Sequence, residues 1–285
     1  MPLLTDLQVT FRCLRDKKLE FTEPGEEVPA PFVALVGGNG SGKTAVLDAI
    51  ALTIGNHMAH QGMISAAGFL RSGWHINLSF TSGGLSARPG HGISITPGAL
   101  HQELRRALYV PSGYLPDMPR RVSLSAGPKS GIPVEQAMAL SMSNRVRALH
   151  QWWLHQHWEY PRTSNLERLW TVLEPFLGDV TYAGVNPEDH LPLFHARGSY
   201  ISFNELSSGE RRLILLFMEV VMQCGTDGLL LLDDPETHFH PEWQRKLRPA
   251  LQSVLPKGQI VVATRSEFIL EDLLPHQQIA LDSAS

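Results

Sequence analysis

The residues best suited to chemistry form a glycine-rich segment, GGNGSGKT, at positions 37–44. A glycine, four further residues and then Gly-Lys-Thr is the pattern of a phosphate-binding loop. Glycines let backbone N–H groups turn towards phosphate oxygens, the lysine adds a fixed positive charge, and the threonine hydroxyl can bind Mg²⁺. The pattern predicts a nucleoside-triphosphate site. Its residues are Gly37, Asn39, Gly40, Ser41, Gly42, Lys43 and Thr44.

A second segment, LLLLDD at 229–234, ends an apolar run in two carboxylates. A phosphate loop needs an acidic residue at the end of a neighbouring strand to hold the metal. We therefore predict that Asp233 binds Mg²⁺ together with Thr44, and that Asp234 faces the attacking water. The alternative is that the two acids merely end a strand before a turn at Pro235.

A third segment, ELSSGE at 205–210, precedes an apolar helix that is expected to stop at Gly225. Ser207 and Glu210 fit a capping box, in which each side chain accepts a hydrogen bond from the other residue's backbone N–H. Capping does not explain Gly209, because glycine weakens the first turn of a helix.

Buried strands and amphipathic helices are expected around these segments. The apolar run 31–36 precedes the phosphate loop, and the helical pattern 44–55 follows it. Two more apolar runs, 228–234 and 259–264, alternate with helical segments. Such alternation predicts a mainly parallel core sheet.

The remaining pattern suggests one domain, 1–285, in three parts. These are an N-terminal β lobe with the phosphate loop (1–115), a loop and helical insert (116–198), and a region with the ELSSGE and LLLLDD segments and the apolar run 259–264 (199–285). The residues between 80 and 92 suggest a turn-rich link, and a helix after Pro241 is expected to kink near Pro249. Shorter strands are predicted at 7–13, 18–22, 74–80, 92–96, 106–111, 179–185, 199–203 and 277–282.

Composition narrows the class of protein. The 285 residues are 43% hydrophobic with a formal net charge of −4, which argues against a uniformly basic nucleic-acid binder. The two cysteines are far apart, so a reducing cytosol is favoured over a disulfide framework. The N-terminus lacks a signal-peptide pattern, and no apolar stretch is long enough to cross a bilayer. We expect a cytoplasmic protein without membrane contact.

These segments together resemble the ATP-binding-cassette (ABC) ATPases, and in particular the non-transporter branch with SMC-like, RecF-like and OLD-like ATPases. The start of the chain resembles that branch's strand pair, phosphate loop and helix. LSSGERR resembles its signature motif, LLLLDDPETHFHP its acidic block, and IVVATRSEFIL its switch strand. The resemblance covers roughly 1–55 and 199–285.

The resemblance implies an α/β P-loop NTPase head with a mainly parallel core sheet, an N-terminal antiparallel β-subdomain and an inserted helical lobe. It implies ATP and Mg²⁺ as ligands, and a head-to-tail homodimer with ATP between the subunits. Lys43, Asp234 and Arg265 would be catalytic. Such heads control an effector, often a nuclease or toxin, and many act in bacterial anti-phage defence. The residues facing the partner's nucleotide would be Ser207, Ser208, Gly209 and Glu210.

Two departures from the family pattern predict slow hydrolysis. Asp234 stands where the family usually has glutamate, and a displacement of about 1 Å can cost roughly a hundredfold in rate. Arg265 stands where the family usually has a switch histidine. An arginine can reach a γ-phosphate, but it cannot shuttle a proton.

Other functions are less favoured. A transporter motor or an ATP-gated scaffold with little turnover are the alternatives to the ATPase. A zinc site at His238 and His240 is less favoured than a loop that contacts the partner subunit. The aromatic segment 150–158 is expected to pack Trp152, Trp153 and Trp158 rather than stack bases. No nuclease motif is recognised, and we expect no nuclease domain after the switch strand. A phosphate-binding face, for which a solvated surface is the favoured alternative, could be formed by Arg105, Arg106, Arg120, Arg121, Lys129, Arg145 and Arg147.

Overall fold

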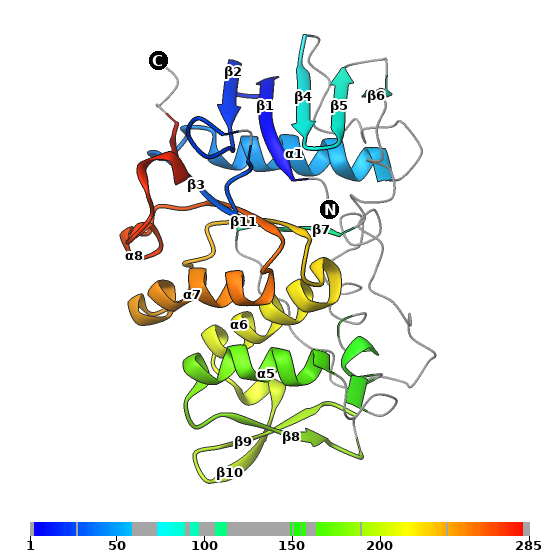
Figure 1. Ribbon diagram of the computed structural model, residues 1–285. Coiled ribbons are helices and arrows are strands. Elements are labelled where there is room, and N and C mark those ends of the chain that lie inside the picture. The colour runs from blue at the N-terminus through cyan, green and yellow to red at the C-terminus, as the bar shows by residue number, and fades with distance from the viewer. Residues whose placement is uncertain are drawn as a thin grey trace.

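The protein folds into stacked layers in the computed structural model (Figure 1). An antiparallel sheet lies over helix α1 (Lys43–Met58), and a parallel sheet lies beneath that helix. Helices α7 (Pro241–Val254), α6 (Ser208–Glu219) and α5 (Ser164–Leu177) follow, and a small sheet closes the far end. The described residues are 3–26, 28–58, 73–88, 92–96, 106–112, 149, 151–154, 156–157, 164–188, 190–237 and 239–281.

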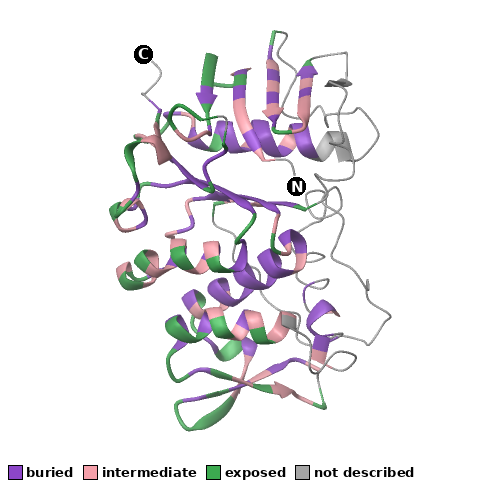
Figure 2. Ribbon diagram, in the orientation of Figure 1, coloured by how far each residue is buried: buried purple, intermediate pink, exposed green. Residues whose placement is uncertain are grey.

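The parallel sheet has the strand order β13-β3-β12-β11-β7. Its three inner strands are almost wholly buried, as expected for parallel strands covered on both faces (Figure 2). Because the strands run the same way, the loops that follow β3 and β11 emerge at one edge. The predicted α/β fold with a mainly parallel core is confirmed. The strands are β3 (Phe32–Val36), β7 (Ala107–Val110), β11 (Leu229–Asp233), β12 (Gln259–Ala263) and β13 (Gln278–Ala280).

The antiparallel sheet has the order β2-β1-β4-β5-β6. The link predicted between residues 80 and 92 is wrong, since most of it forms strand β5, which pairs with β4 in a hairpin. Gly83 and Gly84 are typical of a turn, so the strand was not predicted. The buried side chains of Leu85 and Ala87 show the alternation expected of a strand. The strands are β1 (Leu4–Phe11), β2 (Leu14–Glu20), β4 (His75–Phe80), β5 (Gly83–Arg88) and β6 (Gly92–Thr96).

A buried glutamine joins the two sheets. Gln259, at the start of β12, is fully buried. Its Oε1 accepts the N–H of Leu4 at 2.7 Å, and its Nε2 donates to the carbonyls of Leu4 at 2.9 Å and Ala30 at 3.2 Å. These bonds satisfy the buried amide, so the first residue of β1 is fixed to the parallel sheet.

The far end is built on an aromatic cluster. Trp153 packs edge-on against Trp170, Tyr182 and Phe194, with ring centroids 5.1 to 6.1 Å apart. Trp152 is buried as well, so the packing prediction is confirmed for these two tryptophans. The small sheet, of which β9 was not predicted, consists of β8 (Thr181–Val185), β9 (Pro192–Ala196) and β10 (Ser199–Ser202).

Several helix ends differ from expectation. Helix α1 continues through Gly55 to Met58, and α7 is unbroken through Pro249. Helix α6 passes into a π-helical turn, η3 (Val220–Cys224), before Gly225 ends it with a φ of 61°. Further short elements among the described residues are η2 (Phe203–Glu205), α8 (Glu267–Leu270) and η4 (Pro275–Gln277).

Some predictions lie outside the described residues, and the three-part division of the domain stays a prediction. In the described part of the chain, no helix is both long and apolar enough to span a bilayer. The predictions outside it are the loop at 116–133, the first part of the helical insert, His238, Trp158, and the basic residues Arg105, Arg120, Arg121, Lys129, Arg145 and Arg147.

Candidate nucleotide site

The phosphate loop is shaped by close contacts with its neighbours. Gly42 has a φ of 101°, and a Cβ there would lie 2.7 Å from Leu14 Cδ2. A Cβ on Gly37 would lie 2.4 Å from the carbonyl of Leu281. Only glycine therefore fits these two positions without displacing the chain. Lys43 folds back along the loop, and its Nζ donates to the carbonyls of Gly37 at 2.7 Å and Gly38 at 2.9 Å.

The predicted metal ligands lie side by side. Thr44 Oγ1 donates to the Asp233 carboxylate, 3.1 Å from Oδ1 and 3.0 Å from Oδ2. Burial raises the pKa of Asp233 to about 6, the Thr44 hydrogen bond opposes this rise, and the charges of Asp234 and Asp48 add to it. A carboxylate and a hydroxyl at the end of a phosphate loop are the protein ligands that Mg²⁺ takes alongside phosphate oxygens.

An orphaned hydroxyl gives a further test of fit. Ser41 is 4% exposed, and its Oγ has no hydrogen-bond partner among the described residues. Buried polar atoms are nearly always paired, so a loop that leaves one unpaired suits an added polar ligand. The residues present therefore fit a phosphate group and a divalent cation. Lys43 and the loop N–H groups would hold the phosphates, and Thr44 and Asp233 would hold the metal.

The turn after β11 brings Asp234 to the same edge. Asp234 has a φ of 44°, in the left-handed region that non-glycine residues seldom adopt. Its N–H donates to the carbonyl of Ala263 at 2.9 Å, and its carboxylate accepts a 3.3 Å hydrogen bond from Ser112. Such conformations cluster at functional sites, in agreement with a catalytic position for this residue.

The switch strand also reaches the phosphate loop. Arg265 Nη1 donates to Asn39 Oδ1 at 2.6 Å, across 226 residues of sequence. Glu236 accepts hydrogen bonds from the Thr264 hydroxyl at 2.8 Å and from the Arg265 N–H at 2.9 Å. The structure thus brings together the phosphate loop, the acidic strand end and Arg265, as the sequence predicted. Glu236, which links two of these segments, was not predicted as a site residue.

Asp48 is a second residue that sequence reasoning missed. It lies one helical turn after Thr44, pairs with Arg12 from the β1–β2 turn, and accepts a 2.9 Å hydrogen bond from Tyr109. Burial is the main cause of the raised pKa of Tyr109, and the Asp48 charge adds to it. The i, i+4 spacing from Thr44 could have placed Asp48 beneath the metal ligands.

The signature segment forms the predicted capping box. The Glu210 N–H donates to Ser207 Oγ at 3.3 Å, and the Ser207 N–H donates to Glu210 Oε2 at 2.7 Å. Ser207 and Ser208 are exposed, whereas Gly209 is buried. Between described residues, no hydrogen bond or ion pair joins these four positions to the phosphate loop.

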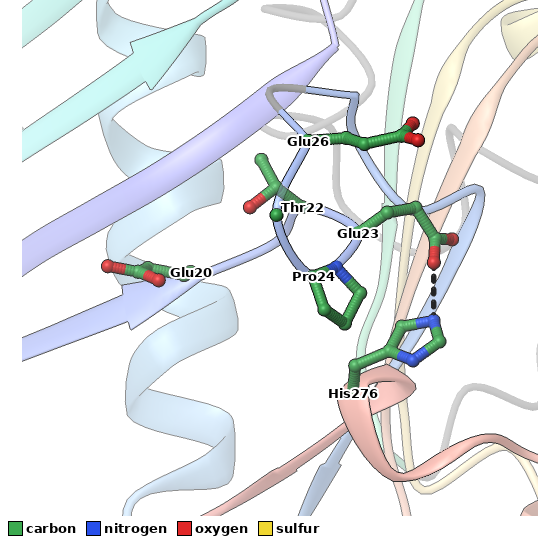
Figure 3. Close-up of a pocket in the computed structure, with 7 residues that line it drawn as sticks. Glu20, Thr22, Glu23, Pro24, Glu26 and His276 are labelled. Carbon is green, nitrogen blue, oxygen red and sulfur yellow. Dashed lines mark ion pairs between the residues drawn. The ribbon is translucent and has the colours of Figure 1, made fainter.

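Another hollow of the described surface does not suit a nucleotide. Its volume is about 480 Å³, and its lining comes from the end of β2, the loop that follows it and His276 of η4, with no residue of the phosphate loop (Figure 3). Glu20, Glu23 and Glu26 line it, and Glu23 pairs with His276 at 2.5 Å. Because three carboxylates repel phosphate, this hollow is a poorer candidate for a nucleotide site than the phosphate loop.

The pKa of Asp233 predicts a pH dependence of stability. Without Mg²⁺ the folded chain should hold more protons than the unfolded chain between about pH 4 and pH 6. The free energy of unfolding should therefore fall by about 1–3 kcal/mol as the pH rises through that window. Asp233→Asn should lack this decrease. Urea titrations of both proteins in EDTA, from about pH 4.5 to 7.5, measure the difference, and parallel pH profiles would contradict it.

Comparisons with known proteins agree with this fold. The structure resembles the "SmcHead bound to the C-winged helix domain of ScpA" with a TM-score of 0.57 at 15% identity, over 94% of this chain and 91% of that one. It resembles the SMC head domain from Thermotoga maritima with a TM-score of 0.51 at 16% identity, over 98% and 94%. The fold is that of an SMC-type head, with a phosphate-loop segment at the edge of its parallel sheet.

The sequence comparisons point to more particular relatives. Residues 10–93 match the family described as "AAA domain", and residues 183–271 match "AAA domain, putative AbiEii toxin, Type IV TA system". The chain is 24% identical to the Septu protein PtuA of Bacillus mycoides (strain KBAB4), over 93% of this chain and 38% of that protein. It is 26% identical to the "Retron Vc95 probable ATPase" of Vibrio cholerae serotype O1 biovar El Tor, over 37% and 23%. The chain thus spans about two fifths or less of these relatives' length.

Proposed function

We propose that this chain binds ATP with Mg²⁺, hydrolyses it slowly, and dimerises head to tail around it to control a partner effector. The observation that carries the proposal is the meeting of three segments at one sheet edge: Lys43 and Thr44, Asp233, and Arg265. Each supplies a group that ATP hydrolysis needs, namely phosphate binding, metal binding and charge at the γ-phosphate.

Slow turnover follows from the two departures from the family pattern. The Asp234 carboxylate is one methylene shorter than glutamate, and it is already hydrogen-bonded to Ser112. Arg265 is held by Asn39, where it can stabilise charge but cannot transfer a proton. A long-lived ATP-bound dimer suits a protein that switches an effector rather than one that drives continuous work.

The effector is proposed from the relatives. Septu and retron proteins are what the chain is similar to, and the AbiEii description names a toxin. We propose that the effector is a nuclease or toxin in bacterial phage defence, and nucleic acid is a candidate ligand of the assembled complex. The transporter motor is disfavoured, because the LSSGE and DDPETHFHP segments resemble the non-transporter branch.

Steady-state hydrolysis tests the proposal. Purified protein should release phosphate from ATP in a Mg²⁺-dependent reaction, well below about 10 per second, the median for enzymes. Asp234→Asn should lower kcat at least about 100-fold, since a positioned general base contributes roughly that much. Asp227→Asn, which removes a carboxylate paired with Arg106, is the control and should keep the wild-type rate. Turnover at tens per second would contradict slow hydrolysis, and no turnover would favour the scaffold.

A further inference from the structure

Arg212 is a buried charge inside the signature helix. It lies four residues after Ser208, one turn into α6, and it is only 3% exposed. A buried guanidinium is costly unless its charge and its donors find partners. Most of α6 is buried, but its first residues reach solvent, so a charged residue placed on the buried part of the helix needs a reason.

The partners of Arg212 lie on the turn after β11. Its Nη2 is 3.4 Å from the carbonyl oxygen of Asp234, and its guanidinium lies 5.8 Å from the centre of the Phe239 ring. Burial lowers the pKa of Arg212, and the charges of Glu236 and Asp234 oppose that shift. The guanidinium thus bridges from the signature helix to the loop that holds the proposed catalytic base.

Arg212 contacts the carbonyl of Asp234, the residue whose backbone lies in the left-handed region. The same Asp234 carbonyl also accepts the N–H of Thr237 at 3.2 Å. With a φ of 44°, Asp234 needs its surroundings to keep that conformation. The direction of the Asp234 carboxylate depends on this backbone conformation. A group that holds the Asp234 carbonyl therefore also orients the proposed catalytic base.

A small cavity extends the contact to the metal ligand. It is of about 10 Å³, close to the volume that admits one water. Arg212 Nη1 is buried and has no partner among the described residues, so a water there would satisfy it. The cavity is lined by Val110, Arg212, Leu216, Leu232, Asp233 and Pro235.

We propose that Arg212 is a positioning residue that couples the start of α6 to the Asp234 turn. ATP on the partner subunit would fix Ser208 and Gly209, and Arg212, one turn along the same rigid helix, would then fix Asp234. Each nucleotide would thereby prepare the catalytic turn of the opposite subunit for hydrolysis. The inference rests on the proposed function, since it needs an ATP-bridged dimer.

The test compares three variants in ATP hydrolysis and ATP binding. Arg212→Met keeps the length of the side chain but removes its donors, and Arg212→Lys keeps the charge and a donor. Arg168→Met is the matched control, because Arg168 also donates to a buried carbonyl, that of Val254 at 3.0 Å, far from the site. ATP affinity is measured with a fluorescent ATP analogue, and the folded state by thermal melting.

Arg212→Met should lower kcat at least about 10-fold and leave ATP affinity within about twofold, since the phosphate loop is untouched. Arg212→Lys should recover part of kcat, and the Hill coefficient for ATP should fall towards 1 in both variants. Arg168→Met should match wild type. If Arg212→Met does not fold, the lysine variant decides, because a wild-type kcat and Hill coefficient in it would overturn the inference. Unchanged kcat in Arg212→Met overturns only this inference, whereas no hydrolysis by the wild-type protein overturns the proposed function with it.

Discussion

Replacing Lys43 by alanine should weaken ATP binding by about 10- to 100-fold, the effect of losing one hydrogen bond to a charged group. Lys43 Nζ lies at the centre of the loop, donating to the carbonyls of Gly37 and Gly38. In the ATP complex this amine would move to the β- and γ-phosphates. Lys43 is the one basic residue of the loop, so no other loop side chain could replace its charge. Isothermal titration with ATP and Mg²⁺ measures the loss.

The fold should survive this change. The two carbonyls that Lys43 leaves lie at the partly open end of the loop, where water can replace the amine. Lys246→Ala is the control, because Lys246 also donates to a backbone carbonyl, that of Pro175 at 3.1 Å, on a distant helix. Affinity within about twofold of wild type for Lys43→Ala would place the nucleotide elsewhere.

Gly209→Asp should leave the chain folded and able to bind ATP but should prevent ATP-driven dimerisation. Gly209 lies in the first turn of α6, where the helix dipole stabilises an acidic side chain. The same carboxylate would stand where the partner's γ-phosphate has to approach, and like charges repel. ATP binding should persist, since no described hydrogen bond joins this turn to the chain's own phosphate loop.

Multi-angle light scattering with and without ATP measures the change from monomer to dimer. Asn204→Asp adds the same charge at an exposed position five residues earlier and should dimerise as wild type does. Gly209→Ala adds a methyl group without the charge, which separates repulsion from crowding in this buried turn. Dimers of the Gly209→Asp protein at the wild-type ATP concentration would mean that helix capping alone explains the segment.

The sequence predicted the phosphate-binding and acidic residues of the candidate site better than the residues that hold them in place. The phosphate loop and Asp233 each follow an apolar strand, and parallel strands bring such ends to one edge, so their meeting was predictable. Arg265 could be placed only through resemblance. Its contact with Asn39 spans 226 residues, which no local pattern encodes.

The residues that were missed share a physical cause. Asp48, Glu236 and Arg212 are charged, and a charged residue in a helix or loop is usually read as solvated. Their roles depend on partners distant in sequence: Tyr109 for Asp48, Thr264 for Glu236 and Asp234 for Arg212. Strands β5 and β9 were missed because glycine and proline at their starts read as turns.

Strand β12 is a short, buried strand with a bonded contact at each end. At its first residue, the Gln259 side chain donates hydrogen bonds to the carbonyls of Leu4 and Ala30. At its other end, Ala263 is followed directly by Thr264 and Arg265. Its five extended residues span only about 16 Å. Strand β12 therefore connects the first strand of the chain, at one end, with the Thr264–Arg265 segment of the candidate site, at the other.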